Sequence, residues 1–157
     1  MTNSAIIEKF IVGRVEPHIY AFETGTVPNY LKIGDTYRPV ETRLNEWRRY
    51  FVDLQKRYDE PATAGDEYFR DLSVHEYIIR EKGCKRLEKT TLPNIPYYSN
   101  EFFENATTDD VNEAIQDIRK SATDKDGRYK LYSMKDGRVP VDFHYERGEE
   151  PIILRPN

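Results

Sequence analysis

The chain has 157 residues, of which 38% are hydrophobic and 33% are charged, with a formal net charge of −4. This length suits one compact domain with a modest core. No apolar run approaches the roughly 20 residues that cross a bilayer, and the first residues lack the basic-then-apolar pattern of a signal peptide, so we expect a cytoplasmic protein with no membrane partner. Because Cys84 is the only cysteine, an internal disulfide and a cysteine-based zinc site are excluded.

Residues 18–34 predict a β-hairpin. The stretch 18–22 (HIYAF) is β-branched and aromatic, and residues 30–34 (YLKIG) form a second strand-like stretch. Turn-forming residues lie between the two. Strand alternation places Tyr20 on the same face as His18, opposite to its immediate neighbours. Gly34 ends the second strand where a side chain would crowd a close approach of backbone or ligand.

A helix is predicted directly after the hairpin. Pro39 suits the first helical position, because its missing N–H has no partner there. Apolar residues follow at spacings of four, three and four from Val40 to Phe51, which is a stripe that would pack on the sheet. Arg43 lies next to this stripe.

The next part of the chain predicts a connection, two helices and a third strand. Residues 53–72 lose periodicity and predict a connection with room for one short strand. Residues 73–76 (SVHE) have the pattern of a capping box that opens a helix ending at Gly83, and residues 84–87 predict the third strand. Residues 107–110 (TTDD) open a further helix with regularly spaced apolar positions. The predicted fold is therefore α/β (α+β), with a small antiparallel three-stranded sheet flanked by helices.

The composition changes after about residue 121. A polar linker leads into residues 128–134 (RYKLYSM), which predict a strand. We therefore expect a domain of residues 1–120 and a C-terminal extension of residues 121–157. The ending ILRPN resembles the segment that precedes the first ATP-site motif of superfamily-two helicases, which implies a C-terminal helicase domain in a longer chain. A self-contained small protein is the alternative.

Three short motifs together resemble the GIY-YIG nuclease domain. Residues 18–20 (HIY) and 32–34 (KIG) stand in the order of the two signature motifs, and Arg43 follows the second motif's glycine by nine residues. Residues 101–103 (EFF) match the context in which the phage and restriction branch of that family places its metal-binding glutamate. The resemblance covers roughly residues 16–120.

This resemblance implies a metal-dependent endonuclease that hydrolyses phosphodiester bonds of double-stranded DNA, in restriction or other DNA processing. Tyr20 would position or deprotonate the attacking water, Arg43 would hold the scissile phosphate and Glu101 would bind Mg²⁺ or Mn²⁺. His75 is a further candidate, because some restriction-type relatives use a histidine in the site. A guanidinium can clamp a phosphate bidentately, and Mg²⁺ needs few protein ligands because it keeps much of its hydration.

Charge is segregated along the chain in a way that favours DNA contacts. Residues 30–58 hold seven Lys or Arg against four acids, and residues 80–89 hold five against two, whereas residues 99–117 contain six acids and no base. Basic segments near the predicted site would contact phosphates. The predicted DNA-binding residues are Lys32, Arg38, Arg48 and Arg49.

Four residues depart from the family pattern, namely His18, Lys32, Asp35 and Trp47. Lys32, for example, stands in place of the tyrosine of the second motif. Two alternatives to a nuclease follow. The domain would recognise DNA without cutting it, or it would be a protein-interaction domain, since tyrosine is favoured in interfaces.

Overall fold

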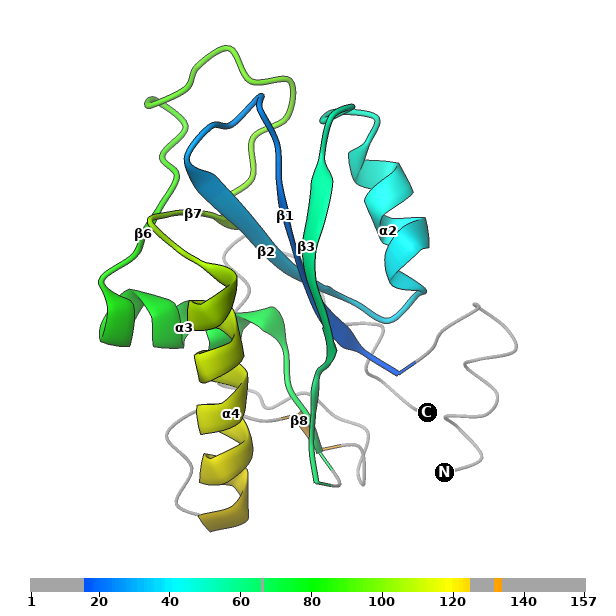
Figure 1. Cartoon of the computed structure of the whole chain (residues 1–157), viewed down its shortest axis with the longest axis vertical. Helices are drawn as coiled ribbons and strands as arrows, with labels where there is room; N and C mark the ends of the chain where they lie inside the picture. Colours follow the sequence, from blue (N-terminus) through cyan, green and yellow to red (C-terminus); the bar gives the residue numbers. More distant parts are fainter. Residues whose placement is uncertain (1–15, 66, 125–131, 134–157) are drawn as a thin grey trace.

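The computed structural model of the protein describes residues 16–65, 67–124 and 132–133, which form a mixed α/β fold (Figure 1). A central sheet has α2 on one side and α3 and α4 on the other, as Figure 1 shows. The predicted fold class is therefore confirmed. The helices are α2 (Val40–Trp47), α3 (Asp71–Lys82) and α4 (Thr108–Asp124).

The central sheet is antiparallel and has five strands in the order β3-β1-β2-β7-β6. Its strands are β1 (His18–Glu23), β2 (Tyr30–Thr36), β3 (Gln55–Pro61), β6 (Lys85–Arg86) and β7 (Phe102–Glu104). A small second sheet consists of β4 (Thr63–Ala64), β5 (Glu67–Tyr68) and β8 (Tyr132–Ser133).

The central sheet is larger than the three strands that the sequence predicts. Strands β1, β2 and β6 correspond to the predicted hairpin and third strand. Strand β3 lies in the connection of residues 53–72, where the sequence leaves room for one short strand, and β7 was not predicted. Strand β3 lies at the edge of the sheet and its residues, QKRYDEP, are mostly exposed, so they show no apolar alternation. Strand β7 has only three residues, too few for a periodic signal.

Alternation along β1 divides the core into two layers. On the α3 and α4 side, Ile19 and Ala21 belong to an aliphatic layer, whereas on the α2 side Tyr20 and Phe22 belong to an aromatic layer. This agrees with the alternation expected from the sequence. The aliphatic layer includes Leu31, Ile33, Val74, Ile78, Phe103, Val111, Ala114, Ile115 and Ile118, and the aromatic layer includes Leu44, Trp47, Phe51 and Phe102.

The start of helix α3 is capped by a side chain of strand β2 rather than by the predicted capping box. The helix starts at Asp71, two residues before Ser73, which lies inside it and is buried. The Asp71 N–H donates to Asp35 Oδ2 at 2.9 Å, so a carboxylate from β2 satisfies this helix terminus. The predicted end is correct, because Gly83 has φ of 67° and the Cys84 N–H donates back to the Ile78 carbonyl.

The other two helices follow their predicted patterns. In α2, Val40, Leu44 and Trp47 are buried, as the apolar stripe predicts. At the start of α4, Thr107 and Asp110 exchange hydrogen bonds of 3.0 and 3.1 Å between side chain and backbone N–H, which is a capping box.

The predicted C-terminal extension falls mostly outside the described residues. Helix α4 continues to Asp124, four residues past the expected boundary, and Tyr132–Ser133 pair with β5. The helicase-like ending lies outside the described part of the chain. Within that part, none of the helices has the length and apolar character needed to cross a membrane.

Candidate functional site

Residues of three elements meet at the hydroxyl group of Tyr20 on the α2 side of the sheet. Tyr20 Oη accepts a hydrogen bond from Trp47 Nε1–H at 2.8 Å and one from Lys32 Nζ at 3.3 Å, although these residues are 27 and 12 positions away in the chain. Lys32 Nζ also lies 2.9 Å from Glu101 Oε1. All four side chains are buried. The structure therefore brings the predicted Tyr20 and Glu101 into one cluster, with Lys32 between them.

Gly34 provides the space for this cluster. A Cβ atom at this position would lie 2.8 Å from both Lys32 Nζ and Tyr20 Oη, which is closer than such atoms approach in proteins. The sequence predicts that Gly34 allows another group to come close to the backbone. In the structure, the groups that come close are the side chains of Lys32 and Tyr20.

Lys32 carries its charge into the interior of the protein. Its ammonium group lies 4.2 Å from the centroid of the Trp47 ring and 5.1 Å from that of Tyr20. Burial by itself would lower the pKa of Lys32, but Glu101 and Tyr20 outweigh it, and the net shift is upward. The lysine therefore stays protonated, held by one carboxylate and by the faces of aromatic rings.

Arg43 is the partly exposed cation of the site. Its guanidinium lies 4.8 Å from the centroid of the Trp47 ring, and Nη1 donates to Glu46 Oε1 at 2.9 Å. Burial tends to lower the pKa of Arg43, but interactions with Tyr20 and Glu46 raise it overall. The side chain keeps 31% of its surface exposed, so a phosphate could reach it from solvent.

The four predicted DNA-binding residues lie in different surroundings. Lys32 has no exposed surface, so its ammonium group is not available to a phosphate at the surface. Arg38 donates two hydrogen bonds of 2.7 Å to the Glu46 carboxylate, and Arg48 donates to Asn45 Oδ1 at 2.6 Å. Arg49 is exposed.

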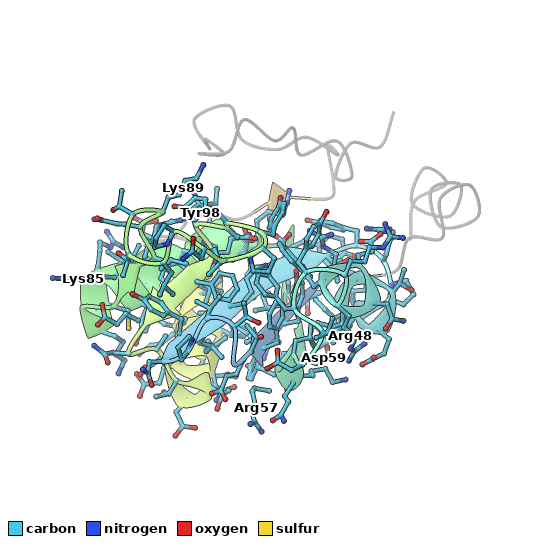
Figure 2. The ribbon with its side chains drawn as sticks, turned by 90° about the horizontal axis from the view of Figure 1, so that it is seen from above. Arg48, Arg57, Asp59, Lys85, Lys89 and Tyr98 are labelled. Carbon is cyan, nitrogen blue, oxygen red and sulfur yellow. The ribbon has the colours of Figure 1, made fainter. Side chains whose placement is uncertain are left out.

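The two basic segments of the sequence do not form one surface. Lys85 belongs to the segment 80–89, and Figure 2 shows it at the far side of the molecule from Arg48. The segment 80–89 nevertheless reaches the site at its other end, because Leu87 packs in the aromatic layer with Tyr20, and Arg86 Nη1 donates to the carbonyl of Asn100, the residue before Glu101.

A second cluster shares Glu101 and lies towards α3. One possible ligand atom from each of Asp71, His75 and Glu101 lies within 4.8 Å of the other two, and all three residues are buried. Backbone pairing holds Glu101 there, because the Ile33 N–H donates to the Glu101 carbonyl at 2.9 Å. The predicted candidate His75 is thus beside the predicted metal ligand.

His75 is neutral and oriented by the backbone of β2. Its Nε2 lies 2.8 Å from the Ile33 carbonyl oxygen, which can only accept, so Nε2 carries the hydrogen. Burial lowers the pKa of His75 to about 3. Within the described part of the chain, Nδ1 is buried and has no hydrogen-bond partner. A lone pair on a buried nitrogen is therefore left without a partner.

Asp71 and Glu101 form a carboxyl pair. Burial, followed by the charges of Asp35 and Glu101, raises the pKa of Asp71, and the Asp71 and Glu101 side chains are hydrogen bonded to each other. Arg70 and Asp35 support this corner, with Arg70 Nε 2.5 Å from Asp35 Oδ2. The raised pKa favours the protonated form of Asp71, whose O–H can then donate to the Glu101 carboxylate.

The sequence interpretation missed Asp71 and Asp35 as members of the site. A signal for Asp71 exists, because it precedes His75 by four residues and would share a helix face with it. The predicted helix begins at residue 73, however, which places Asp71 in a connection. No local signal marks Asp35, because its partners follow more than 30 positions later.

When the chain is compared with models of protein families, with curated proteins and with solved structures, nothing matches. The resemblance to GIY-YIG nucleases therefore stays a prediction from the motif residues quoted above.

Proposed function

We propose that this protein is a metal-dependent DNA endonuclease of the GIY-YIG type, as its motifs imply. The observation that carries the proposal is the convergence of Tyr20, Arg43 and Glu101, one from each of the three motif regions, around Lys32 and Trp47. Gly34 supports the proposal further, because a side chain at this position would collide with Tyr20 Oη and Lys32 Nζ.

Tyr20 would act on the attacking water or on the phosphate. The Tyr20 hydroxyl oxygen accepts two hydrogen bonds, from Trp47 and Lys32. Its O–H hydrogen can still be donated. An oxygen of water or phosphate is the natural acceptor. The two N–H donors also hold the phenol in one position, which is what an attack in line with the leaving group requires.

Arg43 would hold the scissile phosphate and stabilise the negative charge that develops on it. The guanidinium is fixed over the Trp47 ring while remaining partly exposed. Glu46 Oε1 accepts hydrogen bonds from both Arg38 and Arg43. The Arg43 guanidinium would therefore bind Glu46 and the substrate phosphate at the same time. Fixed cations of this kind stabilise a phosphoryl transition state without reorganising.

A divalent cation, Mg²⁺ or Mn²⁺, fits the corner at Glu101. The chemistry of the donors supports this, since the carboxyl groups of Glu101 and Asp71 offer oxygen ligands, which both ions accept. Such an ion, when bound, neutralises phosphate charge and lowers the pKa of a coordinated water.

Contacts with DNA would extend from Arg43 along the surface of α2 to Arg38, Arg48 and Arg49. Tyr50 and Tyr97 are each 42% exposed, and their rings lie 4.6 Å apart beside Trp47. Exposed aromatic rings next to cations can stack on unpaired bases. This surface is therefore where the DNA backbone would pass.

Cleavage of supercoiled plasmid in the presence of Mg²⁺ or Mn²⁺ tests the proposal. We expect metal-dependent nicking that falls by about 100-fold or more in Glu101→Gln and in Arg43→Ala. The matched control is Arg80→Ala, which removes an exposed helical arginine paired with Glu76 on α3. Equal cleavage by all four proteins would indicate a contaminating nuclease and would count against the proposal.

A second candidate, DNA recognition without cleavage, is favoured by the buried ion pair. Lys32 already occupies Glu101 Oε1, and neither side chain is more than 5% exposed. This candidate predicts no cleavage with any divalent ion, and DNA binding that weakens with salt and in Arg43→Ala. A protein-interaction domain would instead show no DNA affinity at any salt concentration.

A further inference from the structure

We infer that Asp71, His75 and Glu101 form a binding site for one first-row divalent transition metal ion, such as Zn²⁺ or Mn²⁺, in preference to Mg²⁺. The inference rests on the proposed function only for the use of the ion, because the site itself follows from the ligand geometry. It adds two ligands to the single glutamate expected from the sequence, and it changes the class of metal.

The spacing of the three side chains suits a common ion. Their ligand atoms lie within 4.8 Å of one another. Three atoms bound tetrahedrally to one metal at about 2.0–2.2 Å lie about 3.3–3.6 Å apart. Side-chain movements of about 1 Å therefore bring the three ligand atoms within bonding distance of one ion.

The unpartnered nitrogen of His75 is an independent sign that this cluster takes a ligand. Nε2 is committed to the Ile33 carbonyl, and within the described residues the buried Nδ1 has no partner. Buried polar atoms are nearly always satisfied in native proteins. In metal-binding histidines, the ring nitrogen that does not bind the metal usually donates its N–H to a carbonyl or carboxylate oxygen. This hydrogen bond fixes the orientation of the ring and its tautomer.

The surrounding residues fix the two carboxylates. Asp71 is the first residue of α3, and its backbone N–H is held by Asp35, which also pairs with Arg70. Glu101 is held through its backbone by Ile33 and through Oε1 by Lys32. Both metal-binding residues are therefore held in position by contacts with neighbouring residues before an ion binds.

The donor set decides the class of metal. Mg²⁺ prefers oxygen ligands and retains several waters, which a buried site with an imidazole serves poorly. One neutral imidazole and two carboxylates instead suit Zn²⁺, Mn²⁺, Fe²⁺ or Co²⁺. Co²⁺ is a useful probe because its visible absorption reports coordination by protein ligands.

Direct metal binding to the full chain is the decisive experiment. Protein refolded with Co²⁺, Zn²⁺, Mn²⁺ or Mg²⁺ would be dialysed and its metal content measured, and the Co²⁺ form would be followed by visible absorption. We expect one equivalent of Co²⁺ that Zn²⁺ displaces and Mg²⁺ does not. We expect an affinity lower by about 100-fold or more in Asp71→Asn, His75→Gln and Glu101→Gln.

Two controls keep the test informative. His75→Gln retains an N–H donor for the Ile33 carbonyl, and Asp71→Asn mimics a neutral carboxyl group, so both variants should remain folded by circular dichroism. His18→Gln alters a partly exposed histidine of β1 that pairs with Asp59 at 2.6 Å, and this variant should bind metal like the wild type. Refolding with the metal present gives the ion access to a buried site.

Absence of a bound equivalent in the folded wild type would overturn the inference, as would binding that survives all three substitutions. Cleavage is not the readout, so the outcome is separate from the proposed nuclease function. A protein that binds Co²⁺ but does not cut DNA would keep the site and reject the nuclease. A nuclease that needs only Mg²⁺ and binds no Co²⁺ would do the reverse.

Discussion

The two faces of the central sheet bury different kinds of residue, although the same strands build both. On the α3 and α4 face, the aliphatic layer excludes water from apolar side chains such as Ile19 and Ile115. On the α2 face, the aromatic layer surrounds the Lys32 ammonium and its carboxylate partner Glu101. The aliphatic layer gains free energy chiefly from apolar burial, whereas the aromatic layer must also compensate the desolvation of two charges. Alternate residues of the same strands thus serve an apolar layer on one face and a layer that holds a buried ion pair on the other.

Glu101 is the point at which the two faces meet. Its Oε1 pairs with Lys32 in the aromatic layer, while its carboxyl group is also hydrogen bonded to Asp71 of α3. A change on either face can therefore reach the site through this one side chain. The difference between the two faces can be tested by substitutions in each layer. Trp47, the only tryptophan of the chain, reports on the aromatic layer by its fluorescence.

The largest effect is expected when the buried ion pair is broken on one side. Lys32→Met leaves the Glu101 carboxylate buried without its cation, which should lower the free energy of unfolding by about 3–5 kcal/mol. Urea unfolding would measure this loss. The double variant Lys32→Met/Glu101→Gln should regain most of it, because no unpaired charge remains. A single variant as stable as the wild type would show that the pair does not hold the aromatic layer together.

A cavity in the aliphatic layer should lower stability without disturbing the aromatic layer. Ile115 has no exposed surface, and Ile115→Ala should cost about 2–5 kcal/mol in the free energy of unfolding. The native-state fluorescence of Trp47 should stay unchanged, whereas Lys32→Met should alter it. A shifted native spectrum in Ile115→Ala would mean that the two layers are coupled more strongly than their separate contacts indicate.

Gly34→Ala tests the aromatic layer by crowding. The added Cβ would lie 2.8 Å from both Tyr20 Oη and Lys32 Nζ, so these groups must move, at a cost of about 1–3 kcal/mol. Thermal unfolding and Trp47 fluorescence would both report the change. Tyr20→Phe in the same background removes one of the crowded atoms and should recover part of the loss. Unchanged stability in Gly34→Ala would show that the cluster is looser than these distances.

The smallest effect is a dependence of stability on pH in protein treated with a chelator. The native state keeps His75 neutral with a pKa of about 3, whereas the unfolded chain binds a proton below about pH 6.5. Stability should therefore fall by about 1 kcal/mol for each pH unit between 6 and 4, in addition to the contribution of other groups. His75→Gln, which does not titrate, should lack this contribution when unfolding is measured across the same range. Identical pH profiles for the two proteins would contradict the assignment.

Much of the local structure could be predicted because its causes are local. The hairpin follows from two strand-like stretches around a turn, and α2 follows from Pro39 and an apolar stripe. The end of α3 follows from Gly83, which can adopt a positive φ. The start of α3 could not be predicted in this way, because its cap is the side chain of Asp35 on a distant strand. The position and length of the edge strand β3 could not be predicted, since a mostly exposed strand needs no apolar alternation.

The sequence by itself determined the alternation along β1, the apolar stripe of α2 and the candidate residues Tyr20, Arg43 and Glu101. Only the tertiary structure decided that Lys32 points inward to Glu101 instead of outward to solvent, and that Asp71 and His75 meet the same carboxylate. The physical reason is that these contacts join residues far apart in the chain. They depend on which strand lies next to which and on how α3 packs across β2, and no local pattern of residues specifies either.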